Sequence, residues 1–245
     1  MTQGHAFPKA HTHSSAIVFG HADADGHIAA EQTRTNLLAD GVHVSAVVVS
    51  AETRNYRFWD RTFIHWDLSP YDMVVAVDIA FSFREPASSL DALLKVVDDH
   101  PTTEFVVIDH HPLSRPRHRR GNLSLIEVQD PHDCCLGQPS EELMAIAALC
   151  DGGPTSVVAN PEMRRRALGV RRGAADLGGV AGTTLLELLA GRRWDFFEAL
   201  ADENPELHRS VRGRRRIGNA PSPLLRSATG RSLSSHPKSP PAKRK

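Results

Sequence analysis

Short apolar runs rich in Val and Ile recur along residues 15–111, and stretches of helix-forming residues separate them. The runs are 15–20 (SAIVFG), 42–50 (VHVSAVVVS), 72–80 (DMVVAVDIA) and 104–111 (EFVVIDHH). Residues 27–40 and 88–100 have the pattern of helices, the second with Ser88 or Ser89 as a candidate cap. Near-continuous apolar strands that alternate with helices are typical of a parallel sheet covered on both faces. The sequence therefore predicts an α/β fold in which helices sandwich a parallel β-sheet.

Beyond these runs, the chain predicts one more strand and a mainly helical end. Residues 122–129 have the composition of a strand, 140–150 form a predicted helix capped by Ser140, and 161–210 are mostly helical in pattern. The end of the chain is rich in Pro, Ser, Gly and Arg, which is typical of disorder. We therefore expect a flexible leader (1–14), an α/β domain (15–160), a helical extension (161–211) and a basic disordered tail (212–245).

Composition limits the class of protein. The chain has 245 residues, of which 40% are hydrophobic, so it is large enough for a sizeable core. No apolar run reaches the roughly 18–20 residues that span a bilayer, and residues 1–15 lack the apolar middle of a secretory signal. We therefore expect a cytoplasmic protein with no membrane partner. Cys134, Cys135 and Cys150 show no CxxC spacing, which argues against a disulfide framework or a thiolate zinc site.

The net charge of zero conceals an asymmetry along the chain. The last acidic residue is Glu206, and residues 207–245 hold 11 Lys or Arg residues, so residues 1–206 carry a net charge of −11. A basic tail on an acidic body can be an arm for nucleic acid or a solvated segment with no partner. Both interpretations stay open at this point.

Three of the predicted strands end in side chains that can bind metal ions. The first ends in His21, Asp23 and Asp25, the third in Asp78, and the fourth in Asp109, His110 and His111. Ligands of open α/β sheets bind outside the carboxyl ends of the strands, so we expect these side chains to meet in one crevice.

The spacing of His21, Asp23 and Asp25 adds to this expectation. In an extended segment every second side chain points the same way, and Gly26 allows a tight turn into the next helix. Crowded carboxylates repel one another, and a cation relieves the repulsion. Imidazole and carboxylate ligands together suit Mn²⁺, Fe²⁺ or Zn²⁺. Taken singly, each residue has a structural explanation, such as Asp25 as a helix N-cap.

These motifs resemble a known family. HADADG, VVAVD and VVIDHH, in this order and spacing, are similar to the first three motifs of the DHH phosphoesterase superfamily, named for its Asp-His-His. The superfamily includes RecJ-type exonucleases, nano-RNases, cyclic-dinucleotide phosphodiesterases and family II pyrophosphatases. Its fourth motif, an aspartate after a helix, is matched by Asp151 in ELMAIAALCD. The resemblance covers about residues 15–160. The single residue between His21 and Asp23 is typical of the RecJ-like branch.

The resemblance implies a site that holds two divalent metal ions, with Mn²⁺ as the expected metal. His21 and Asp23 would hold the first ion, and Asp25, His110 and Asp151 the second. Asp78 would bridge the two ions, Asp109 would act behind the ligands, and His111 would face the substrate phosphate. Two such ions activate water for hydrolysis of a phosphoester.

The implied function is hydrolysis of phosphodiester or phosphomonoester bonds in nucleotides, short oligonucleotides or single-stranded nucleic acid. The chain departs from the family after residue 160, because nothing there resembles the Gly-rich, His-containing motif of the usual second domain. The glycines of 176–182 (DLGGVAG) lie in a helical context without a neighbouring histidine. The alternative is therefore a truncated or catalytically impaired DHH-fold protein that acts as a nucleotide-binding or nucleic-acid-binding module.

Overall fold

A computed structural model describes residues 15–50, 58–81, 86–111, 119–129, 134–138, 140–151, 160–177 and 182–202. The predicted leader at 1–14 and basic tail at 212–245 lie outside the described residues. The strands are β1 (Ser15–His21), β2 (His43–Ser50), β3 (Met73–Val77), β4 (Glu104–Asp109), β5 (Arg119–Arg120) and β6 (Leu123–Glu127). The helices are α1 (Ala24–Ala39), α2 (Pro86–Asp99), α3 (Glu141–Asp151), α4 (Pro161–Leu177), α5 (Gly182–Ala190) and α6 (Trp194–Asp202), with short helical turns η1 (Phe58–Thr62) and η2 (Phe63–His65).

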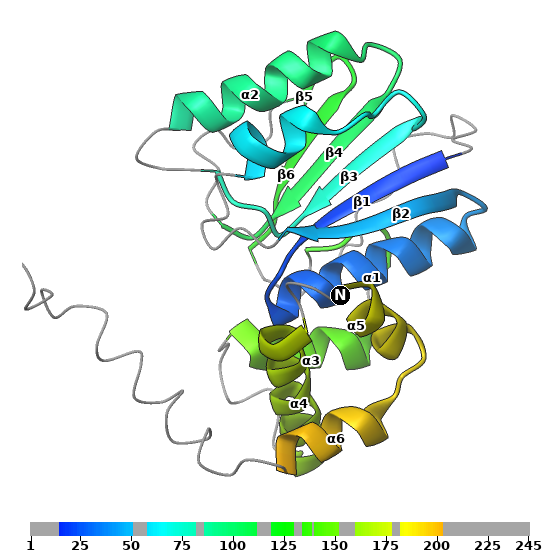
Figure 1. Cartoon of the computed structure of the whole chain (residues 1–245), viewed down its shortest axis with the longest axis vertical. Helices are drawn as coiled ribbons and strands as arrows, with labels where there is room; N and C mark the ends of the chain where they lie inside the picture. The colour runs from blue at the N-terminus through cyan, green and yellow to red at the C-terminus, as the bar shows by residue number, and fades with distance from the viewer. Residues whose placement is uncertain are drawn as a thin grey trace, which may run out of the picture. The chain divides into compact units, whose positions relative to one another are not determined.

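The strands form one sheet in the order β2-β1-β3-β4-β6-β5 (Figure 1). The pairs β1–β2, β1–β3, β3–β4 and β4–β6 are parallel, and β5 pairs antiparallel with β6. The predicted fold class, a parallel sheet between helices, is confirmed. The two-residue strand β5 was not predicted, because two consecutive arginines carry no strand pattern.

Each face of the sheet packs against different helices, as the alternation along β1 shows. Ile17 and Phe19 lie in an apolar cluster that includes residues of η1, η2 and α2. Ala16 and Val18 point to the other face and join a cluster with α1. Successive strand residues point to opposite faces, so an uninterrupted apolar run supplies buried side chains to both faces of the sheet.

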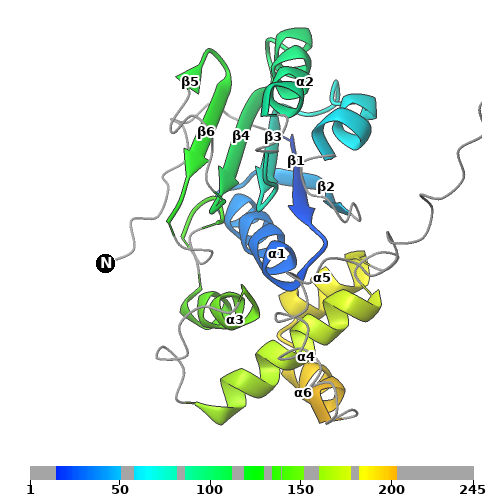
Figure 2. The ribbon, with the colours of Figure 1, turned by 90° about the vertical axis from the view of Figure 1, so that its left-hand side faces the viewer.

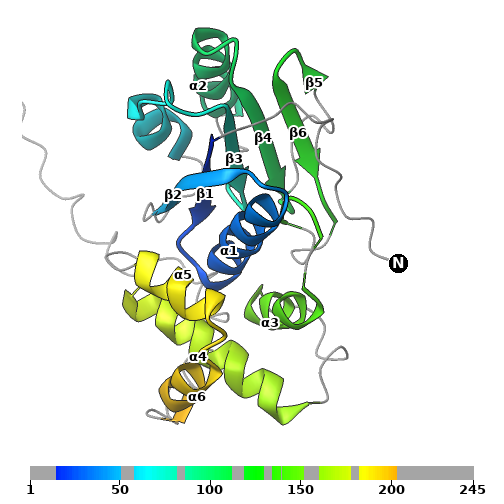
Figure 3. The same cartoon turned by 90° about the vertical axis from the view of Figure 1, so that its right-hand side faces the viewer.

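Helices α3, α4, α5 and α6 gather beyond the carboxyl ends of the strands, next to the start of α1 (Figures 2 and 3). Ala24 and Ile28 of α1 share a buried cluster with residues of all four helices. Helix α1 is therefore covered on nearly all sides, and it lacks the apolar stripe of a surface helix. None of the described helices is long and apolar enough to cross a membrane.

Two helices begin earlier than the sequence predicts. Helix α1 starts at Ala24 instead of residue 27, because Asp23 caps it. Helix α2 starts at Pro86, a residue type that is favoured in a first helical turn, so Ser88 and Ser89 lie inside the helix and the predicted serine cap is wrong. The first shift places Asp25 in a helix, which changes the geometry of the site described below.

Polar side chains of α1 hold the segment that leads from β6 to α3. Thr33 Oγ1 accepts a hydrogen bond from the Leu136 amide (3.1 Å), and Asn36 Nδ2 donates to the Leu136 carbonyl (2.7 Å). Gln32 Oε1 accepts from the amide of Ser140, just before α3 (3.0 Å). These bonds satisfy backbone groups that would otherwise be buried without partners. They also fix the start of the helix that ends in Asp151.

Replacing Thr33 by Val should lower the free energy of unfolding by about 1–3 kcal/mol, because it leaves the buried Leu136 amide without an acceptor. Urea denaturation measures the change. Thr62→Val is the control, since the Thr62 side chain makes no capping hydrogen bond at η2. Equal stabilities of the two variants would contradict the proposed role of Thr33.

Candidate metal centre

The predicted site residues come from the ends of neighbouring elements. His21 is the last residue of β1, Asp78 follows β3, and Asp109 ends β4. These strands are adjacent and parallel, so their carboxyl ends lie at one edge of the sheet. Asp25 reaches this edge from the first turn of α1, and Asp151 from the last residue of α3.

The structure brings all eight predicted site residues into three overlapping groups. Within each group, one ligand atom of every residue lies within 4.8 Å of those of the others. The groups are His21, Asp23 and Asp78; Asp25, His110 and Asp151; and Asp78, Asp109, His110 and His111. Asp78 and His110 each belong to two groups and connect the whole set.

The turn between β1 and α1 differs from its predicted conformation. Asp23 is the N-cap of α1, and its carboxylate accepts a hydrogen bond from the Gly26 amide (3.1 Å). His21 Nδ1 lies 2.7 Å from the second oxygen of Asp23. Asp25 is helical, so the prediction that all three side chains alternate along an extended segment is wrong at Asp25. The helical turn nevertheless buries Asp25, with its carboxylate 3.9 Å from His110 Nε2.

Gly26 allows the close contact between the start of α1 and the end of β1. A Cβ atom at this position would lie 2.5 Å from the His21 carbonyl oxygen and 2.8 Å from its Cβ. No real side chain tolerates such contacts without a backbone shift. Gly26 therefore allows His21 and Asp23 to lie on the same side as Asp25.

Gly26→Ala should lower the free energy of unfolding by about 2–3 kcal/mol, because the added methyl group forces α1 away from His21. It should also weaken Mn²⁺ binding, measured as a smaller rise in Tm when the metal is added. Gly173→Ala is the control, because its Cβ would come closest to the flexible end of Leu185, at 3.2 Å, and would meet Phe197 and Leu200 at ordinary contact distances. If the two variants behaved alike, the close contact at Gly26 would have no role in the site.

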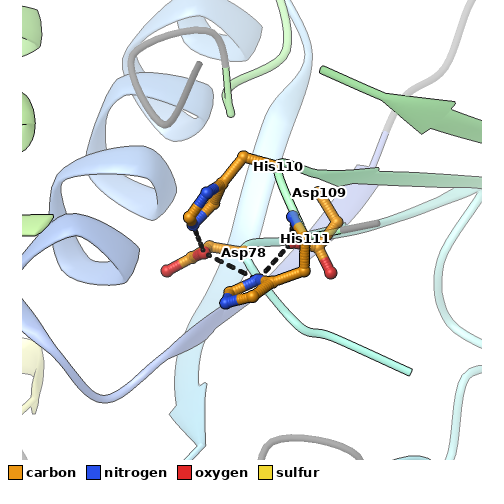
Figure 4. A group of neighbouring side chains, drawn as sticks. All are labelled: Asp78, Asp109, His110 and His111. Atoms are coloured by element: carbon orange, nitrogen blue, oxygen red, sulfur yellow. Dashed lines mark hydrogen bonds and ion pairs between the residues drawn. The ribbon is translucent and has the colours of Figure 1, made fainter. Parts of the chain in front are cut away.

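Asp78 is held in a strained backbone conformation at the centre of the site. Its φ of 57° is left-handed, which is rare for a residue with a side chain. The Asp78 amide donates to the Ile108 carbonyl of β4 (2.9 Å), which fixes this turn. The carboxylate is buried, and neither oxygen accepts a hydrogen bond from the described part of the chain. His110 Nε2 lies 3.0 Å from Oδ1 (Figure 4).

Asp109 and His111 form a second, distinct pair. Asp109 is fully buried, and its Oδ1 accepts hydrogen bonds from the His111 amide (3.0 Å) and from His111 Nδ1 (2.8 Å; Figure 4). This hydrogen bond raises the pKa of His111 above its usual value. The side chain of His111 is 40% exposed, so a buried carboxylate orients an imidazole that solvent can reach.

The carboxylates are too crowded to be ionised together without a cation. Burial raises the pKa of Asp25 to about 7, and the charge of Asp23 adds to the effect. Burial also raises the pKa of Asp78 well above its usual range, and the neighbouring aspartates act in the same direction. Burial opposes ionisation of Asp23, but the hydrogen bond and charge of His21 lower its pKa. Divalent cations would satisfy the Asp78 oxygens, which accept no hydrogen bond from the described residues, and would relieve this repulsion, so the donor set fits a metal centre.

Two residues beside the site were missed from the sequence. His27 is buried, and its Nδ1 donates to the Asp23 carbonyl (2.6 Å). Cys134 is also buried, and its thiol donates to the Ile108 carbonyl (3.7 Å), behind Asp78. His27 follows Gly26 directly and could have been noticed from that position. Cys134 lies far from the motifs in sequence and has no spacing signal.

Comparison with known proteins returned solved structures only. No family model and no curated protein matches the chain. The chain is similar to RecJ. The structure of RecJ from Thermus thermophilus in complex with Mn²⁺ matches with a TM-score of 0.44 and 18% identity, over 83% of this chain and 35% of RecJ. CDC45 from Entamoeba histolytica matches with a TM-score of 0.33 and 19% identity, over 76% of this chain and 34% of CDC45. The chain thus spans about a third of the length of each.

Proposed function

We propose that the chain is a RecJ-like member of the DHH superfamily and a metal-dependent phosphoesterase. The observation that carries this proposal is the placement of Asp78, whose buried carboxylate is grouped with His21 and Asp23 of the first ion set and lies 3.0 Å from His110 Nε2 of the second. A carboxylate shared in this way is what a pair of neighbouring divalent ions requires of a bridging ligand.

We assign His21 and Asp23 to the first ion, and Asp25, His110 and Asp151 to the second, in agreement with the groups that the structure brings together. Asp78 is proposed to bridge the two ions. Manganese is the proposed metal, because imidazole and carboxylate ligands occur together here. When bound, such ions lower the pKa of water and stabilise charge on a phosphoryl oxygen.

We propose that Asp109 and His111 together transfer a proton to the leaving oxygen of the substrate. The Asp109 carboxylate accepts from His111 Nδ1, so it holds the imidazole in one tautomer and favours its protonated form. The exposed imidazole can then approach a substrate phosphate. Asp109 is a positioning residue in this scheme, and His111 contacts the substrate.

The proposed substrates are nucleotides, short oligonucleotides or single-stranded nucleic acid, because the motif spacing is RecJ-like. The test uses purified protein with Mn²⁺ and four substrates: bis-p-nitrophenyl phosphate, a 3′,5′-bisphosphate nucleotide, pyrophosphate and a labelled single strand. We expect turnover of at least one phosphoester and its loss with EDTA. Bound Mn²⁺ without turnover of any substrate would overturn the enzyme proposal.

Bound Mn²⁺ without turnover is also the outcome that the second candidate function predicts. A binding module would keep the fold and metals but lack the substrate-gripping histidine of the family's second domain. In the described ranges 160–177 and 182–202, which follow the candidate site, no histidine is present. A labelled oligonucleotide that binds with Mn²⁺ but stays intact would support this function.

A further inference from the structure

Most described basic side chains are engaged in ion pairs or hydrogen bonds within the protein. On α4, Arg165 pairs with Asp202 and Glu198, and Arg172 donates to the Leu200 carbonyl. Four further arginines form ion pairs with Asp or Glu side chains: Arg34, Arg166, Arg192 and Arg193. These cations stabilise the protein and are not free to meet a ligand.

Three described basic side chains form no ion pair or hydrogen bond with another described residue: Arg61, Lys95 and Arg171. Arg164 does have a partner. Arg61 lies in η1 and Lys95 in α2, which pack on the sheet face opposite to α1. Arg171 lies in α4, which packs against α1 and α3. Of the three, Arg171 belongs to the group of helices that carries part of the candidate metal centre.

Helix α4, which carries Arg171, packs against the parts of α1 and α3 that lie next to Asp25 and Asp151. Ala167 and Val170 of α4 are buried in one cluster with Ala24, the residue before Asp25. The thiol of Cys150, the residue before Asp151, donates to the Ala167 carbonyl (3.5 Å).

Arg171 follows Val170 directly and lies one helical turn after Ala167, so it flanks the contact between α4 and Cys150. It lies on the side of α4 away from Arg165, which pairs with α6. Its side chain is exposed.

The exposed Arg171 guanidinium makes no ion pair or hydrogen bond with another described residue, so it has no internal role in the part of the chain that the structure describes.

We propose that Arg171 binds a phosphate group of the substrate, next to the phosphoester that is hydrolysed. The inference rests on the proposed function and deepens it, because it requires a substrate with phosphate beyond the reacting group, as in an oligonucleotide. Arginine suits this task, since its planar guanidinium donates two parallel hydrogen bonds to phosphate oxygens. A small phosphodiester such as bis-p-nitrophenyl phosphate has no such second phosphate.

The test compares Arg171→Gln with Arg165→Gln, which removes a cation from the same helix on the flank that faces α6. For a short single-stranded oligonucleotide, Arg171→Gln should raise KM about tenfold and leave kcat nearly unchanged, because one charged contact is lost. The slope of log affinity against log salt should fall by about 0.7. KM for bis-p-nitrophenyl phosphate should not change. Arg165→Gln should match the unmodified protein in every measurement.

Equilibrium binding separates a failure of this inference from a failure of the proposed function. Anisotropy of a fluorescein-labelled oligonucleotide, with Ca²⁺ in place of Mn²⁺, measures affinity whether or not turnover occurs. A tenfold loss for Arg171→Gln supports the contact even if the protein hydrolyses nothing. Affinity and salt slope equal to those of Arg165→Gln would overturn the inference, whatever the activity.

Discussion

Replacing Asp78 by Asn should lower Mn²⁺-dependent turnover by about 10³-fold or more, the largest effect expected of any single substitution. Asn presents one neutral oxygen where the native carboxylate offers two charged oxygens that no described donor satisfies. Both proposed ions would lose a ligand at once, because Asp78 is grouped with His21 and Asp23 and also contacts His110, a proposed ligand of the second ion. The rise in Tm on addition of Mn²⁺ should shrink with the loss of activity.

The same substitution should leave the metal-free protein folded and at least as stable as the native chain. Burial and neighbouring charges raise the pKa of Asp78, so ionisation of this group opposes folding, and a neutral amide removes the opposition. Asp60→Asn, at an exposed residue of η1, is the control and should change neither activity nor stability. Turnover that survives in Asp78→Asn would show that the site is assigned to the wrong residues.

The metal-free protein should become less stable as the pH rises from about 4 to about 7, and Mn²⁺ should reverse this trend. Burial, followed by the charge of Asp23, raises the pKa of Asp25 from 3.8 to about 7. Between these values the folded chain binds more protons than the unfolded chain, so the free energy of unfolding falls with rising pH. The shift corresponds to a loss of up to about 4 kcal/mol. The raised pKa of His111 acts in the same direction, since its contribution is lost as the pH rises through the folded-state pKa.

Urea denaturation in EDTA at about pH 5 and about pH 8 measures this dependence. Asp25→Asn should flatten most of it, because the amide cannot ionise. Burial lowers the pKa of His27, which destabilises the protein as the pH falls below 6.5, and this effect should persist in the variant. With Mn²⁺ the native chain should gain stability with rising pH, because ligands bind metal in their deprotonated form. A metal-free protein whose stability rises from about pH 5 to about pH 8 would contradict the crowded-carboxylate description.

The end of β1 shows the limit of predicting a local conformation from residue spacing. The alternation of His21, Asp23 and Asp25 predicted that they face one pocket through an extended conformation, which the chain does not adopt at Asp25. Asp23 caps α1 by accepting the Gly26 amide, and the helix then turns Asp25 into the site. A strand and a helical turn can present the same side chains to one crevice, so residue spacing alone did not distinguish them.

The sequence by itself determined the parallel sheet and the chemistry at its edge, because apolar runs specify buried strands and parallel strands share a carboxyl edge. His21, Asp78 and His110 were proposed as ligands for this reason. The tertiary structure alone decided the left-handed turn at Asp78, the placement of Cys134 and the packing of α4, which carries Arg171, against α1 and α3. These features depend on helices that pack against the start of α1 from far along the chain, and such contacts leave no periodic signal in the sequence.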